Sequence, residues 1–142
     1  MTYIDCYLIP VPIENRAAYE QLARSSAQVL REYGAMRVVE CWLDHSGPEA
    51  ASYHESEARL DSGQYATFVQ AASAHKGETV VMSFVEWSDK ATRDAGMEKV
   101  TSDPRMQFED QPPTFDRRRL IAGGFKPMLD VASDARLERW RT

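Results

Sequence analysis

The order of the regular segments is the feature that most constrains how this chain can fold. Two strand–helix–strand units follow each other, and an irregular stretch separates them. The predicted segments are strand 3–10, helix 18–33, strand 36–44, strand 79–87, helix 88–102 and strand 118–127. This order predicts an α+β fold of the split β-α-β, or ferredoxin-like, type: a four-stranded antiparallel sheet in the order 4-1-3-2, with both long helices on one face.

The ends of the two long helices carry recognisable signals. Asn15 is a plausible N-cap for the first helix, and Gly34 supplies a left-handed stop after it. Ser88 is the expected cap of the second helix, with Asp89 favoured by the helix dipole in its first turn. That helix must end before Pro104, because the residue before a proline avoids the helical region.

Length and charge limit the class of protein. A chain of 142 residues fits one domain, 1–142, with a core that needs no disulfide or metal. The net charge is −5 and the basic residues are scattered, which argues against nucleic acid or an anionic membrane as partner. No apolar stretch approaches the roughly 18–20 residues of a membrane span, and the first ten residues do not form a signal peptide. We therefore predict a cytoplasmic protein.

Two parts of the chain lie outside the paired units. Residues 46–76 are predicted to be a variable insertion, in which 46–64 lack periodicity and 65–75 form a short helix. A helical turn is expected near residues 55–60. Residues 131–142 are a predicted C-terminal extension, with a short helix over 133–141.

Alternation along the first two strands separates a purely apolar set of residues from a mixed set. The apolar set is Ile4, Cys6, Leu8, Val39, Cys41 and Leu43, and the mixed set is Tyr3, Asp5, Tyr7, Val38, Glu40, Trp42 and Asp44. We expect the apolar set to pack on the helices and the mixed set to lie on the other face. Residues 79–87 are apolar on both faces, which predicts a central strand and leaves open which face lines a cavity.

The helix-free face would then expose a large aromatic patch on a monomer. Patches of that kind mark an interface. Two such sheets packed face to face would bury the patch and enclose a cavity, so we predict a symmetric homodimer.

The cysteines and histidines do not predict a metal or haem site. Cys6 and Cys41 would lie two strand spacings apart, roughly 9–10 Å, whereas a disulfide needs Cα atoms within about 7 Å. Both are expected to be free thiols in the core, on the helix side. Asp44 and His45 point to opposite faces of a strand, and no histidine lies on an inward-facing strand position, so we expect no metal and no cofactor.

Four sequence blocks resemble the YbaA-like proteins, domain-of-unknown-function family 1428. They are YIDCYLIPVP, EYGAMRVVECW, ETVVMSFVEWSDKATRDAGMEKVTSDPRM and LIAGGFKPMLD, in the family's order, and the match covers about four-fifths of the chain. The stretch 46–64 is longer than expected of the family, and the tail after Asp130 is additional. The resemblance implies the dimeric α/β-barrel superfamily, which includes small monooxygenases, haem-dependent chlorite dismutase-like enzymes and stress-response barrels. It implies no activity.

Several polar and aromatic residues are candidates for a site in the cavity between two sheets. Glu40 is the candidate general base, and Tyr7 and Arg119 are candidates to orient or polarise a substrate. The candidate lining residues are Asp5, Trp42, Phe84, Glu86 and Arg105. The alternative for each is an internal network of ion pairs and hydrogen bonds. For Arg105 that alternative is a helix stop, with Asp103 as cap and Pro104 as the first residue of the next turn.

Two functional hypotheses follow. In the first, the homodimer binds a small apolar or aromatic molecule, and acts on it as a cofactor-independent monooxygenase or isomerase. In the second, the protein is a non-catalytic stress-response or regulatory barrel whose polar residues only support dimerisation. The substrate, and the question of whether the protein is an enzyme, stay open at this stage.

Overall fold

The computed structural model describes residues 1–61, 63–108 and 111–133. The strands are β1 (Tyr3–Pro12), β2 (Arg37–Trp42), β3 (Glu78–Trp87) and β4 (Ile121–Phe125), and the helices are α1 (Arg16–Glu32), α2 (Phe68–Ala71) and α3 (Lys90–Ser102). The predicted terminal helix, apart from Ser133, lies outside the described residues. Within them, no helix has the length and apolar character needed to cross a membrane.

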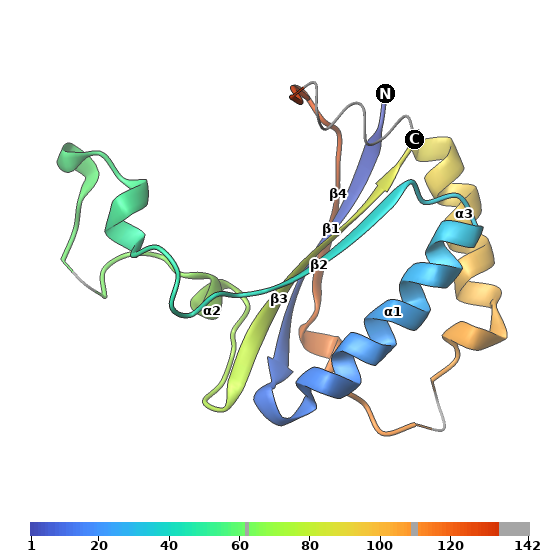
Figure 1. Ribbon diagram of the computed structural model, residues 1–142, viewed down its shortest axis with the longest axis horizontal. Coiled ribbons are helices and arrows are strands. Elements are labelled where there is room, and N and C mark those ends of the chain that lie inside the picture. Colours follow the sequence, from blue (N-terminus) through green and yellow to red (C-terminus); the bar gives the residue numbers. More distant parts are fainter. Residues whose placement is uncertain (62, 109–110, 134–142) are drawn as a thin grey trace.

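The four strands form one antiparallel sheet in the order β2-β3-β1-β4, which is 4-1-3-2 when read from the other edge. Helices α1 and α3 cover one side of this sheet, and the short α2 lies on the other side (Figure 1). The predictions of an α+β fold and of a four-stranded antiparallel sheet are therefore confirmed.

The helix ends follow the predicted signals with two corrections. Asp89, not Ser88, caps α3: its side chain accepts a hydrogen bond from Thr92 N at 2.6 Å. Asn15 occupies the N-cap position of α1 but makes no cap bond; its side-chain amide nitrogen donates to Thr114 O at 3.0 Å. The helix stop after α3 is as expected, since Asp103 caps a 3-10 turn that begins at Pro104.

The predicted assignment of the two sheet faces is wrong. Asp5 contacts Arg93 of α3, and Glu40 contacts Tyr19 of α1, so the mixed set faces the helices. The apolar set lies on the side away from α1 and α3, which we call the open face. Its members are Ile4, Cys6, Leu8, Val39, Cys41, Met82, Phe84, Ile121 and Phe125. Of the mixed set, Asp5, Glu40 and Trp42 are tolerated under the helices because their polar groups find partners there.

Both cysteines are free, as predicted, but they are partly exposed on the open face and are not core residues under the helices. The central position of β3 is confirmed. Its residues Val81, Ser83, Val85 and Trp87 turn toward the helices.

Three predicted segments are shorter than the sequence pattern indicates. Strand β4 begins at Ile121, because Arg117–Arg119 form a 3-10 turn capped by Asp116. Helix α2 begins after Thr67, which makes a capping box with Gln70, and it ends before Ser73, whose φ is 53°. In the insertion, the expected helical turn is a 3-10 turn at Ser56–Ala58.

Helix α3 approaches the sheet closely at Gly96. A Cβ atom at this position would lie 2.6 Å from the Trp87 ring and 2.6 Å from Tyr33 O. Trp87 is fully buried, so neither neighbour can easily move. Glycine is therefore required here by packing, against its low helix propensity.

We expect Gly96→Ala to lower the free energy of unfolding by about 2 kcal/mol, because the overpacking outweighs the roughly 1 kcal/mol gained from helix propensity. Urea denaturation followed by circular dichroism measures the change. Lys99→Ala on the same helix is the control, and it should stay within about 0.5 kcal/mol of the wild type. A Gly96→Ala variant as stable as the wild type would contradict this packing.

Candidate functional site

Three hydrogen-bonding side chains form a row across the centre of the sheet. Tyr7 of β1 is the register partner of Ser83 of β3, and Ser83 is the partner of Glu40 of β2. Register partners have the same side-chain direction, so all three point toward the helix layer. Two of the three predicted catalytic residues, Tyr7 and Glu40, are thus brought together by the fold.

Ser83 is the smallest member of this row and leaves a space between its two neighbours. A cavity of about 330 Å³ occupies this space, between the sheet and the helices. Apart from the row, Tyr19, Ser26 and Arg117, its lining is apolar: Ile9, Leu22, Ala23, Ala27, Leu30, Val38, Val85, Met97, Val100, Met106, Phe108, Phe115 and Leu120. A mostly apolar cavity with a few convergent polar groups is typical of small-molecule sites.

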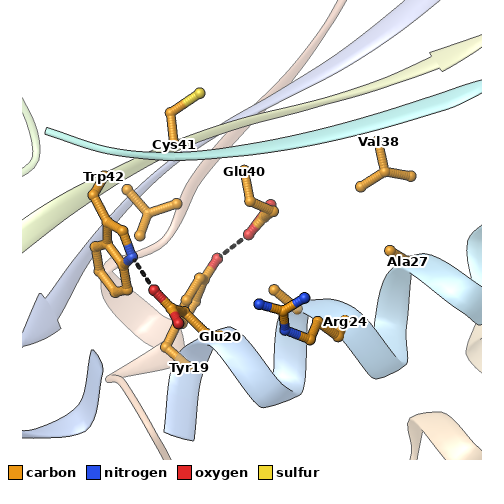
Figure 2. Close-up of a pocket in the computed structure, with 10 residues that line it drawn as sticks. Tyr19, Glu20, Arg24, Ala27, Val38, Glu40, Cys41 and Trp42 are labelled. Carbon is orange, nitrogen blue, oxygen red and sulfur yellow. Dashed lines mark hydrogen bonds between the residues drawn. The ribbon is translucent and has the colours of Figure 1, made fainter. Parts of the chain in front are cut away.

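Tyr19 of α1 completes the polar end of the cavity. Its hydroxyl donates a hydrogen bond to Glu40 Oε1 at 2.5 Å (Figure 2). Burial and this bond to a carboxylate raise the pKa of Tyr19 well above its ordinary value, so the phenol stays protonated at neutral pH. The bond fixes one oxygen of Glu40, an exposed residue of the edge strand β2, and leaves the other oxygen free of this bond.

The two hydroxyls of the row, those of Tyr7 and Ser83, are available to a ligand. Within the described residues, neither Tyr7 nor Ser83 has a side-chain hydrogen-bond partner, although Ser83 is buried. Burial and the nearby Asp5 carboxylate raise the pKa of Tyr7, so it too is a neutral donor. The row therefore offers two hydroxyls beside one carboxylate.

A second pocket of about 300 Å³ lies between α1 and the edge strand β2, and it shares five lining residues with the first: Tyr19, Ala23, Ala27, Val38 and Glu40. Figure 2 shows Val38, Glu40 and Trp42 pointing from β2 toward α1, while Cys41 points to the opposite side. We call this pocket the mouth. It adjoins the polar end of the cavity at the edge of the sheet.

Trp42 forms one wall of the mouth, as a member of a fixed cluster. Its indole N–H donates to Glu20 Oε1 at 2.8 Å, and its ring meets Tyr19 edge-on with centroids 5.4 Å apart. The Arg16 guanidinium lies 4.9 Å from the centre of the Trp42 ring. Trp42 thus lines a pocket on the helix side of the sheet, whereas the sequence predicted it in a cavity on the helix-free face.

Asp5 is close to the row in sequence but belongs to a structural network. Arg93 Nε donates to both of its carboxylate oxygens, at 2.9 and 3.2 Å, and Trp87 Nε1 donates to Oδ2 at 3.1 Å. These bonds connect β1, β3 and α3. Asp5 was predicted to line a cavity. In the structure it takes part in an internal network of ion pairs and hydrogen bonds, which was the alternative given for it above.

The two predicted arginines lie elsewhere. Arg119 donates to both carboxylate oxygens of Glu78 and to Ser73 O, and this pairing lowers the pKa of Glu78 to about 2. Arg105 pairs with Asp103 and Glu32 on the outer side of α1. Both arginines lie in 3-10 turns, and their guanidinium groups pair with carboxylates other than Glu40.

Phe84 and Glu86 lie on the side of β3 away from α1 and α3, and so not in this cavity. The Arg37 guanidinium is 5.5 Å from the centre of the Phe84 ring. Glu86 is buried, and its Oε2 atom has no hydrogen-bond partner in the described structure. None of the pockets described above includes either residue.

Two residues of the site are not identified by the sequence pattern. Tyr19 fits the apolar stripe of α1, and Ser83 fits an otherwise apolar strand. The sequence signal for Ser83 is its small, polar side chain between Val81 and Val85 on one face of a buried strand. A small residue there leaves unfilled space beside the strand. Among the described residues, no three His, Cys, Asp or Glu side chains gather as metal ligands.

The fold and the site together define an α+β protein with a cavity between its antiparallel sheet and its helices. The family model "Protein of unknown function (DUF1428)" matches residues 2–117, and the chain belongs to this family. It is 34% identical over 130 residues to "Uncharacterized protein YbaA" of Escherichia coli strain K12, covering 92% of this chain and 99% of that protein. The Shigella flexneri protein of the same name matches equally. The structure of Rv0793 from Mycobacterium tuberculosis aligns with a TM-score of 0.48 and 14% identity, over 94% of this chain and 100% of that one.

Proposed function

We propose that this protein binds a small, mainly apolar molecule in the cavity between the sheet and α1, with one polar group of the ligand held by the row. The observation that carries this proposal is the row itself. Tyr7, Ser83 and Glu40 converge from three adjacent strands on an apolar cavity, and two of them have no partner among the described residues. These two hydroxyls have no hydrogen bond within the described residues to give up, so a ligand that bonds to them gains interactions without breaking any in the protein.

The arrangement also favours a ligand that carries a hydroxyl group or an acidic C–H. Glu40 is held by Tyr19 through one oxygen, and its second oxygen can accept a proton. Tyr7 and Ser83 can donate to a neighbouring carbonyl oxygen, which stabilises the negative charge left on the ligand. A proton transfer of this kind is the step that an isomerase or a cofactor-independent oxygenase requires; an oxygenase would also take up molecular oxygen.

We expect Glu40→Gln to weaken binding of the probe 2-naphthol, a planar aromatic with one hydroxyl, by at least about tenfold. The amide removes the charged acceptor, and a hydrogen bond to a charged group contributes about 1.5–3 kcal/mol. Titration of the probe fluorescence against purified protein measures the affinity. Native mass spectrometry of freshly purified protein shows whether a natural molecule is retained.

The control is Glu20→Gln, which removes a carboxylate at the mouth but keeps an acceptor for Trp42. It should change the probe affinity less than about threefold. Ser83→Val fills the gap in the row and should abolish binding in a folded protein. If the wild type and Glu40→Gln bind 2-naphthol with equal affinity, Glu40 does not contact the ligand.

A second candidate function is supported by the open face. Its Met82, Ile121 and Phe125 side chains are large and exposed, although they lie at the centre and one edge of a sheet. We propose that two copies pair through this face as a homodimer, which serves a non-catalytic role if the cavity proves empty. The side chains of the row cannot contribute to the interface of such a dimer, because they point toward the helices. Light scattering coupled to size-exclusion chromatography at micromolar concentration should give twice the mass of 16.1 kDa.

A further inference from the structure

The cavity between the sheet and the helices is lined by one negative and one positive side chain. Among the described residues that line it, Glu40 and Arg117 are the only two that carry a charge. All the others are apolar or carry a hydroxyl group. The function proposed above gives Glu40 a contact with the ligand but leaves Arg117 without a role.

Arg117 differs from its neighbours because it has no anionic partner. It opens the 3-10 turn before β4, and the next two residues of that turn, Arg118 and Arg119, each pair with a carboxylate. For Arg117, the described part of the chain provides neither a hydrogen-bond acceptor nor an ion pair. Its guanidinium lies 5.5 Å from the centre of the Phe108 ring, which also lines the cavity. Contact with an aromatic ring leaves the N–H groups of a guanidinium available to a ligand.

Glu40 and Arg117 reach the cavity from opposite edges of the sheet. Glu40 lies on the edge strand β2, and Arg117 lies in the turn that leads into β4, the other edge strand. Three strand spacings separate β2 from β4, or roughly 14 Å at about 4.8 Å each. A ligand with an anionic group is therefore favoured when that group lies beside Arg117 and away from Glu40.

A larger cleft adjoins the cavity at Arg117. Its volume is about 780 Å³, and it shares Leu22, Phe108 and Arg117 with the cavity. None of the described residues that line this cleft is acidic, and its polar members are amides, hydroxyls and arginines: Asn15, Gln21, Ser25, Gln28, Arg105, Gln111, Thr114 and Arg117. Arg105 already pairs with two carboxylates, so Arg117 is the cation that a ligand can use. In a chain with a net charge of −5, this lining is suited to an anion.

We infer that Arg117 is a specificity-determining residue that pairs with a carboxylate of the ligand, so that the ligand is an apolar or aromatic carboxylic acid with its hydroxyl or carbonyl group at the row. This inference rests on the function proposed above and names the class of ligand. A guanidinium presents two parallel N–H donors that match the two oxygens of a carboxylate. One arginine also balances one negative charge, which favours a carboxylate over a doubly charged phosphate.

Three naphthalene probes test this assignment. 2-Naphthol carries only the hydroxyl; 6-hydroxy-2-naphthoate adds a carboxylate at the opposite end of the ring system, and 6-hydroxy-2-naphthamide replaces that carboxylate by a neutral group of the same shape. We expect the wild type to bind the carboxylate at least about fivefold more tightly than the amide, which is the upper range for an ion pair open to water. Titration of probe fluorescence against the full chain measures the three affinities.

Arg117→Gln should abolish the preference for the carboxylate over the amide, because it removes the charge and keeps a polar side chain of similar reach. Arg117→Lys keeps the charge but not the paired donors, and should retain part of the preference. Arg118→Gln is the matched control, since Arg118 is the next residue in the chain but lines neither the cavity nor the cleft. Its preference should stay within about twofold of the wild type, as for a surface pair.

Circular dichroism melts show whether each variant keeps its fold. If the wild type binds 2-naphthol but does not distinguish the carboxylate from the amide, or if Arg117→Gln keeps the preference, the role of Arg117 is overturned while the proposed function stands. A wild type that binds none of the three probes would overturn both.

Discussion

Asp5→Ala should lower the free energy of unfolding by about 3 kcal/mol, a loss of about 10 °C in melting temperature for a domain of this size. Asp5 is only 4% exposed, and it accepts bonds from Arg93 and Trp87. Its removal leaves the Trp87 N–H buried without a partner, at a cost of about 1–3 kcal/mol. It also removes the carboxylate that Arg93 uses to attach α3 to β1. The ion pair itself contributes less, because Arg93 is partly exposed to water.

Asp94→Ala is the matched control for this experiment. Asp94 also accepts a bond from Arg93, at 3.1 Å, but its side chain is 49% exposed. A surface pair of this kind contributes about 0–1 kcal/mol. Urea denaturation of both variants compares the two pairs directly. If Asp5→Ala and Asp94→Ala lower the free energy of unfolding equally, burial adds no stability to the Asp5 network.

Met82→Asp should weaken the proposed homodimer at least 100-fold, which corresponds to about 2.7 kcal/mol. Met82 lies on the central strand β3 at the middle of the open face and is 44% exposed in the single chain. Pairing of two open faces would bury it, and burying an unpaired carboxylate costs several kcal/mol. Dilution experiments by mass photometry or sedimentation measure the dissociation constant.

The control is Met36→Asp, because Met36 is 41% exposed but lies in the connection between α1 and β2. It should leave the dissociation constant within about threefold of the wild type. Met82→Lys should act like Met82→Asp, which separates desolvation of charge from repulsion between acidic subunits. If Met82→Asp dimerises as the wild type does, the open face is not the interface.

The two proposed functions are compatible in one molecule. The cavity and its mouth lie on the helix side of the sheet, and the open face lies on the other side. Pairing of open faces would leave the mouth between α1 and β2 accessible to a ligand. Loss of the dimer in Met82→Asp should therefore leave probe binding by the row intact.

The sequence by itself determined the elements, the α+β class, the central position of β3 and the family. These follow from local periodicity, cap and breaker residues, and blocks of similar residues, which are all properties of short segments. Alternation also determined correctly that Glu40 and Trp42 share one face of β2 and Cys41 the other.

Only the tertiary structure decided which of those faces the helices cover. Alternation has two equivalent solutions, and the rule that apolar residues face the helices failed because Arg93, Tyr19 and Glu20 supply partners for the polar groups there. The tertiary structure also decided that Ser83 would stand between Tyr7 and Glu40, since register between strands far apart in the chain sets that row. A cavity is a property of the space between such segments, and no single segment of the sequence specifies it.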